Sequence, residues 1–175
     1  MYSGYELIWL FFCTSFLGWL LETVSAATRQ RKFANRGIVN APFCVIYGVA
    51  AVIITVFCQE LYGFWLFAES TILATVIEWI AGHLIEKMYH ERWWDYSKIK
   101  WNLDGYICFP ISLLWGALAY VMMRWGNSLM LDLYHLVPKF VGQIALLILV
   151  GILTADMAAT LIVLSGRSKR IEQWQ

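Results

Sequence analysis

The chain has 175 residues, of which 61% are hydrophobic and only 14% are charged, and its formal net charge is +1. Soluble domains carry roughly 25% charged and roughly 45–50% apolar residues, and a domain of this size leaves much of its surface in water. The composition therefore excludes an ordinary soluble domain, a disordered chain, a disulfide scaffold and a nucleic-acid binder driven by net charge. It predicts one integral membrane domain over residues 1–175, embedded in a lipid bilayer.

Apolar segments long enough to cross about 30 Å of hydrocarbon occur along the whole chain. They lie at residues 5–27, 42–59, 63–88, 107–123 and 140–164. We therefore expect an all-α fold, a polytopic bundle of about five transmembrane spans. The third segment is longer than a span needs, so we expect it to tilt or to protrude from the bilayer.

The basic residues divide unequally between the loops. Eleven of the 13 Lys and Arg residues fall in the loop after the first segment, the loop after the third segment and the C-terminal tail. Only Arg124 and Lys139 fall on the other side. Because cytoplasmic loops hold the excess of Lys and Arg, we predict that the N-terminus is outside and the C-terminus is cytoplasmic. An odd number of spans agrees with this orientation.

Several carboxylates occur where the bilayer penalises charge. Glu22 lies in the first segment, Glu78 in the third, Glu86 near the inner end of the third, and Asp156 in the fifth. A charge at the centre of a span costs at least about 2.5–3.5 kcal/mol on insertion scales, so such groups face the protein interior or water. They mark a substrate or ion path, or they are neutralised or paired and fix helix packing. With Arg36 as a partner, they predict a polar cavity that opens to the cytoplasm.

The loop before the second segment offers a candidate anion site. Asn35 suits a turn, and we expect Asn40 to cap the second segment with Pro42 in its first turn. A helix N-terminus presents free N–H groups and a positive dipole. Together with Arg36 and Asn40 it would hold an anion such as a phosphate headgroup. The alternative is a capped helix beside an arginine that snorkels to the membrane surface.

The loop after the third segment contains paired tryptophans with adjacent charges, which is typical of a segment at the lipid headgroups. Asp95 and Asn102 in this loop have no role in such an anchor. They either complete the cytoplasmic cavity or cap short helices.

Metal and enzyme signatures are weak or absent in the sequence. His83, Glu86 and His90 share a helix face if the third helix persists that far, but no second cluster accompanies them, so we expect no metal and no cofactor. The sequence lacks GxSxG and HExxH, and it lacks GxxxxGK[ST]. An ATP-driven process would therefore need a separate ATPase chain.

Several short motifs follow one another along the chain between Tyr5 and Gly116. They are Phe16–Thr23, Asn35–Gly37, Pro42, Ile46–Gly48, Ile77–Trp79, Trp93–Ser97 and Asn102–Cys108. Together they resemble the CmpB-like family of ABC-transporter type IV permeases, which are small bacterial membrane proteins. Ala41 and Val45 replace a glycine and a proline of the family pattern. The resemblance implies a multi-pass protein of the bacterial plasma membrane with a permease function and an ATPase partner.

Three functions follow from these features. The first is a transporter component whose substrate or ion path is formed by Glu22, Asn35, Arg36, Glu78, Asp95, Asn102 and Asp156. The second is a membrane-embedded enzyme that acts on a lipid or a lipid-linked phosphate, with Arg36 on the phosphate and Glu22 or Asp95 as general base. The third is a structural or assembly subunit. We favour the transporter and, because five spans are few for a transporter acting alone, we expect a homodimer or a partner subunit.

Overall fold

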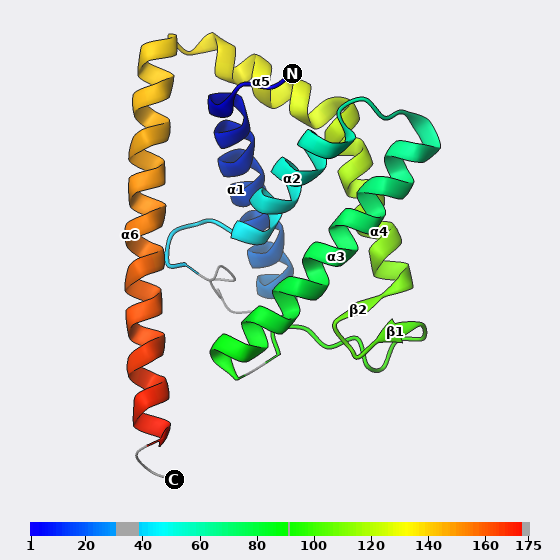
Figure 1. The fold of residues 1–175 in the computed structure, drawn as a ribbon, viewed down its shortest axis with the longest axis vertical. Coiled ribbons are helices and arrows are strands. Elements are labelled where there is room, and N and C mark those ends of the chain that lie inside the picture. Colours follow the sequence, from blue (N-terminus) through cyan, green and yellow to red (C-terminus); the bar gives the residue numbers. More distant parts are fainter. Residues whose placement is uncertain (31–38, 91, 173–175) are drawn as a thin grey trace.

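The structure is a computed structural model that describes residues 1–30, 39–90 and 92–172. Helices and a two-stranded hairpin follow one another along the chain (Figure 1). The elements are α1 (Gly4–Gln30), α2 (Val45–Cys58), α3 (Gly63–Tyr89), β1 (Asn102–Leu103), β2 (Ile107–Cys108), α4 (Phe109–Val121), η1 (Met122–Gly126), α5 (Asn127–Leu136) and α6 (Lys139–Glu172). In the antiparallel hairpin, Asn102 pairs with Cys108 and Leu103 with Ile107.

Three helices are long and apolar enough to cross a membrane, namely α1, α3 and α6. Helix α2 is apolar but has only 14 residues, and at about 1.5 Å per residue it reaches about 21 Å, which is less than the hydrocarbon thickness. The lengths and compositions indicate a multi-pass membrane protein and confirm the α-helical class. Helices α1 and α3 also cover the first and third predicted segments to within a few residues.

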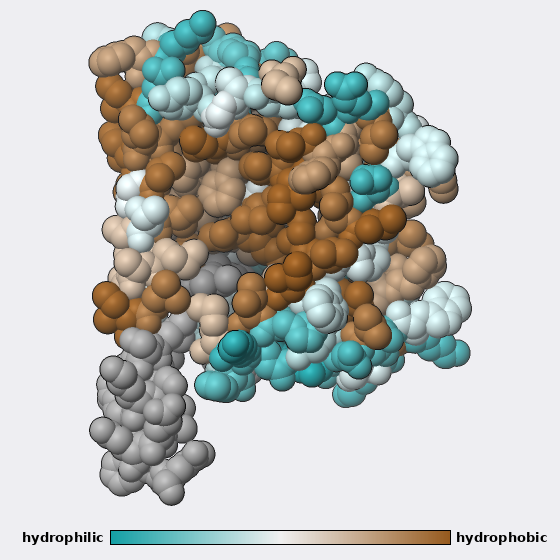
Figure 2. Space-filling model, viewed as in Figure 1, coloured by the Kyte–Doolittle hydropathy of each residue, from teal (hydrophilic) through white to brown (hydrophobic). Residues whose placement is uncertain are grey.

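The helices alternate in direction (Figure 1). Helices α1, α3 and α6 run one way, α2 and α4 run the other way, and α5 crosses one end of the molecule to reach α6. A hydrophobic band lies between two hydrophilic ends in the same view (Figure 2). The alternation agrees with an odd number of spans. Which end of the molecule faces the cytoplasm stays a prediction.

The predicted start of the second segment differs from the structure. The second segment does not begin at Pro42, because α2 begins at Val45, and its N-cap, Cys44, forms no side-chain capping bond. The expected cap by Asn40 is therefore also wrong, because the Asn40 amide binds Asp156 instead. Residues 39–44 form a nonhelical approach to α2.

The fourth predicted segment, 107–123, is wrong at both ends. Its first two residues pair in strand β2, and the helix begins at Phe109. At the other end the helix does not stop but continues through the π-helical segment η1 into α5. At this junction the Asn127 amide donates to Thr55 Oγ1 of α2 at 2.9 Å and to Met123 Sδ at 3.4 Å.

Close helix contacts at glycines bring α1 against α2. A Cβ atom at Gly18 would overlap the ring of Tyr47, and one at Gly48 would overlap Ser15 and lie 2.7 Å from the Phe11 carbonyl oxygen. Small residues allow such close approach between membrane helices. One apolar cluster, with Phe12, Tyr134 and Leu146 among its buried members, joins α1, α5 and α6.

Candidate functional site

Glu22 on α1 is held by a tyrosine of the neighbouring helix. The Tyr47 hydroxyl on α2 donates a hydrogen bond to Glu22 Oε1 at 2.8 Å. Gly18, one helical turn before Glu22, leaves the space in which the Tyr47 ring lies. The close α1–α2 contact therefore determines where this carboxylate is bound.

Glu78 on α3 is buried, with 6% of its surface exposed. Its Oε1 atom accepts hydrogen bonds from the Tyr96 hydroxyl and from Trp115 Nε1, both at 3.0 Å. Its Oε2 atom is buried and has no hydrogen-bond partner among the described residues. Since a buried polar atom is normally hydrogen-bonded, Oε2 is an unused acceptor inside the bundle.

These two carboxylates belong to one arrangement, which we call the aromatic–carboxylate cluster: Glu22, Tyr47, Glu78, Tyr96 and Trp115. The Tyr47 and Trp115 rings meet edge to face with centroids 5.5 Å apart. Burial, and then the Glu78 carboxylate, raise the pKa of Tyr96, with a smaller contribution from Glu22. Within the described ranges neither carboxylate forms an ion pair with Lys or Arg.

The loop after α3 folds so that Tyr96 reaches Glu78. Asp95 accepts hydrogen bonds from the Ser97 amide at 2.9 Å and the Ser97 hydroxyl at 3.0 Å, and these bonds, the amide first, hold the pKa of Asp95 below its usual value. The Asn102 amide donates to the Ile99 carbonyl at 2.7 Å. The structure thus places Asp95 and Asn102 in hydrogen bonds that shape the loop around Tyr96.

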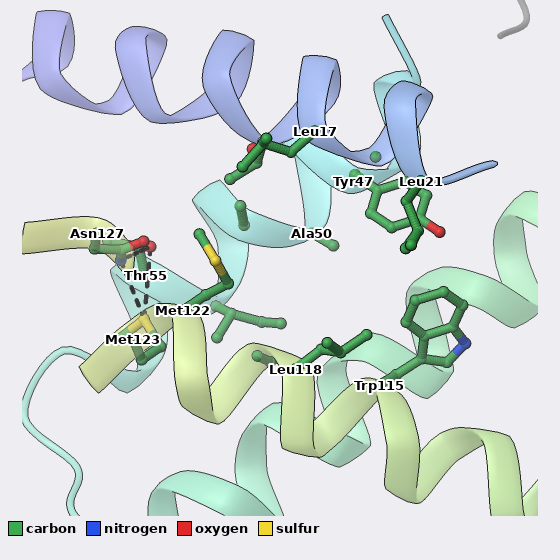
Figure 3. Close-up of a pocket in the computed structure, with 15 residues that line it drawn as sticks. Leu17, Leu21, Tyr47, Ala50, Thr55, Trp115, Leu118, Met122, Met123 and Asn127 are labelled. Atoms are coloured by element: carbon green, nitrogen blue, oxygen red, sulfur yellow. Dashed lines mark hydrogen bonds between the residues drawn. The ribbon is translucent and has the colours of Figure 1, made fainter. Parts of the chain in front are cut away.

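An apolar pocket of about 210 Å³ lies beside the cluster, between α1, α2, α4, η1 and α5. Tyr47 and Trp115 line one end of it. Figure 3 shows the Tyr47 hydroxyl and the indole nitrogen of Trp115 on the same side, away from the Asn127 end of the pocket. Because these two atoms donate to Glu22 and Glu78, the carboxylates lie beyond this aromatic end.

The opposite end of the pocket has a small polar contact. Asn127, Thr55 and Met123 meet there (Figure 3). The Asn127 amide donates to Thr55 Oγ1 at 2.9 Å, and the Thr55 hydroxyl lies 3.6 Å from Met123 Sδ. These groups bind one another, so their hydrogen-bonding capacity is largely used within the fold.

Asp156 has different partners from the other intramembrane carboxylates. Its Oδ2 accepts a hydrogen bond from the Ala41 amide at 2.7 Å, and its Oδ1 accepts from the Asn40 side chain at 2.8 Å. The nonhelical segment 39–44, which these bonds attach to α6, is partly buried, with Val39 2% and Phe43 9% exposed. Nonhelical backbone that is partly buried needs hydrogen-bond partners, and Asp156 supplies one for the Ala41 amide.

The inner end of α3 does not form the metal site considered from the sequence. Helix α3 ends at Tyr89, and His90 adopts a left-handed conformation with φ 56°, so the shared helix face is lost. Glu86 pairs with Arg92 Nε at 3.1 Å and accepts from the Tyr106 hydroxyl, while His83 stacks on Tyr106 with centroids 3.8 Å apart. The described part of the chain holds no group of three His, Cys, Asp or Glu side chains that could bind a metal.

Asn35 and Arg36 lie outside the described residues, so their place relative to Glu22 and Glu78 stays a prediction. The same holds for the cytoplasm-facing polar cavity lined by Glu22, Arg36, Glu78 and Asp95. The apolar pocket is a different feature, because none of these four residues is among those that line it.

The sequence did not single out Tyr47, Tyr96 or Trp115 as site residues. Tyr47 and Tyr96 occur there only as parts of motifs, and the paired tryptophans after the third segment indicate a segment at the lipid headgroups. Trp115 offered a usable signal, since it lies well inside the predicted fourth segment, where an interfacial anchor is not needed. A buried indole N–H usually has a hydrogen-bond partner. A tryptophan at this position therefore indicates an acceptor on another helix.

The comparisons with known proteins give a family but no individual relative. The model of the family described as "Putative ABC-transporter type IV" matches residues 9–161. The match covers most of the chain, which therefore belongs to this family. No curated protein and no solved structure matches the chain.

Proposed function

We propose that this member of the ABC-transporter type IV family is a membrane subunit of a bacterial plasma-membrane transporter, with the aromatic–carboxylate cluster on its substrate path. The observation that carries the proposal is Glu78, a buried carboxylate with one oxygen that has no partner among the described residues and the other bound to Trp115, a residue that lines a pocket. Ionisable groups inside a bundle are costly and commonly mark substrate or ion pathways. Glu22, on a different helix, adds a second carboxylate to the same path.

Transport by this chain would require an ATPase subunit. Family membership suggests such a partner, and the sequence lacks the GxxxxGK[ST] motif that would bind ATP phosphates. We place the docking surface on the basic loops at the end of the bundle that we predict to be cytoplasmic. Lys98 and Lys100 are exposed in the loop after α3 and are available to such a partner.

The test is purification of the tagged full chain from its native membrane, followed by measurement of ATP hydrolysis. We expect ATP hydrolysis to co-purify with the chain. The double variant Lys98→Glu with Lys100→Glu should lower the recovered hydrolysis several-fold, because it reverses the charge of the docking loop. The matched control is Lys139→Glu, a charge reversal at the exposed start of α6, which should leave the recovered hydrolysis unchanged.

Two outcomes would contradict the proposal. One is a chain that purifies intact from detergent and from nanodiscs with no associated ATP hydrolysis. The other is equal loss of hydrolysis in the Lys139 control and in the loop variant, which would show that the loop has no specific role.

A further inference from the structure

The aromatic–carboxylate cluster has hydrogen-bond donors but no counter-charge among the residues that the structure describes. Glu22 receives a donor from Tyr47, and Glu78 receives donors from Tyr96 and Trp115. No Lys or Arg among the described residues pairs with either carboxylate. Neutral donors do not replace a missing positive charge, and buried carboxylates are normally paired. The part of the cluster that the structure describes is therefore complementary to a cation.

The unused oxygen of Glu78 provides a second, independent observation. Glu78 is more than nine-tenths buried, and its Oε2 atom has no described hydrogen-bond partner. Its Oε1 atom is bound by Trp115, whose ring lines the pocket. This oxygen thus lies behind the aromatic end of the pocket, where no described donor offsets its charge.

The lining and the volume of the pocket indicate which ligand body would fit it. Its lining is almost entirely apolar, and its volume is about 210 Å³, which suits a short hydrocarbon body. Tyr47 and Trp115 lie at one end of this apolar space (Figure 3), and their polar atoms donate to Glu22 and Glu78. Aromatic rings of this kind attract ammonium groups through their π faces.

We infer that the pocket and the aromatic–carboxylate cluster form one binding site for an organic ammonium ion with a small apolar body. The apolar body occupies the pocket, and the ammonium group lies against the Tyr47 and Trp115 rings, with the Glu22 and Glu78 carboxylates behind them as its counter-charge. The inference rests on the proposed function, because it names the substrate class of the same path. An anion of the same shape is repelled by the two carboxylates, and a neutral analogue leaves them uncompensated.

The test measures binding of radiolabelled hexylammonium to the full chain in nanodiscs of zwitterionic lipid, with empty nanodiscs as the baseline. Hexanol and hexanoate serve as the neutral and anionic probes of the same length. We expect hexylammonium to bind about tenfold tighter than hexanol or more, as cation–π and carboxylate contacts predict. We expect no specific binding of hexanoate.

Two pairs of variants locate the site. Glu78→Gln should weaken hexylammonium binding about tenfold or more, because it keeps the shape and removes the charge; Glu69→Gln, at an exposed position of the same helix, should not change it. Ala50→Phe should fill the pocket and weaken binding to a similar extent, whereas Val49→Phe, at the adjacent exposed position, should not.

Equal binding of hexylammonium and hexanol would overturn the inference, and so would full binding by the Glu78 variant. The outcome is separable from the test of the proposed function. If ATP hydrolysis co-purifies but hexylammonium does not bind, only the substrate class is wrong. If hexylammonium binds as predicted and no ATPase is found, the binding site stands and the transporter assignment fails.

Discussion

Two intramembrane acids, Glu78 on α3 and Asp156 on α6, look alike in the sequence but differ in the structure. Asp156 binds the Ala41 amide and the Asn40 side chain, so both of its oxygens have partners. Glu78 is bound by Tyr96 and Trp115 through one oxygen only, and the other is unused among the described residues. Asp156 accepts a hydrogen bond from the backbone of a nonhelical segment. Glu78 instead keeps one oxygen without a partner among the described residues, near a pocket.

This difference shows that the membrane penalty alone does not separate structural acids from functional ones. A carboxylate whose oxygens all bind fixed protein donors is part of the fold. Glu78 keeps one oxygen and its charge without a partner among the described residues, and our inference assigns that charge to a ligand. The distinction rests on the identity of the hydrogen-bond partners, and each of the following predictions tests one side of it.

The largest expected effect is on stability, at Asp156. Asp156→Ala removes the acceptor of the Ala41 amide and of Asn40, and we expect it to lower the free energy of unfolding by roughly 2–3 kcal/mol. Thermal unfolding in one detergent measures the change. Thr154→Ala on the same helix, whose hydroxyl binds only its own helix backbone, serves as the control. Equal stability of the Asp156 variant and the wild type would show that Asp156 does not hold residues 39–44.

The next effect concerns the helix contact that positions Tyr47. At Gly48 an added Cβ would overlap Ser15 and approach the Phe11 carbonyl, so we expect Gly48→Ala to destabilise the protein by about 1–2 kcal/mol. Gly151→Ala is the matched control, because nothing lies within 4 Å of a Cβ there, and it should stabilise α6 slightly through helix propensity. The prediction fails if both variants shift the melting temperature in the same direction.

The smallest effect concerns the Tyr96 hydroxyl. Tyr96→Phe removes one of the two donors to Glu78 Oε1 but keeps the ring, so we expect a loss of about 1 kcal/mol in stability. Hexylammonium binding should stay within about threefold of the wild type, since the Glu78 charge remains. Unfolding and probe binding on the same preparation measure both quantities. Complete loss of probe binding would instead make Tyr96 a direct ligand contact.

The long helices could be predicted from the sequence because apolar runs report directly on span length. Helices α1 and α3 follow such runs closely. Helix α5 was missed because Asn127, Asp132 and His135 interrupt the apolar pattern, and its packing against α1 and α6 through Met130 and Tyr134 is not a local property. The pairing of Ile107 with Leu103 is likewise set by contact across a turn.

The candidate site could be predicted only in part. Glu22 and Glu78 were found because a charge inside a span is conspicuous in the sequence. Their partners were not, since Tyr47, Tyr96 and Trp115 come from three different parts of the chain and meet only after folding. The same limit applies to Asp156, whose contact with Ala41 joins residues 115 positions apart.

The most direct test compares hexylammonium binding by Glu78→Gln and Asp156→Asn, measured side by side in nanodiscs at a temperature where both variants are folded. Each substitution replaces one intramembrane carboxylate by its amide. The account predicts that the Glu78 variant loses binding about tenfold or more, while the Asp156 variant binds as the wild type does and unfolds at a lower temperature. Equal loss of binding in both variants, or retained binding in the Glu78 variant, would contradict it.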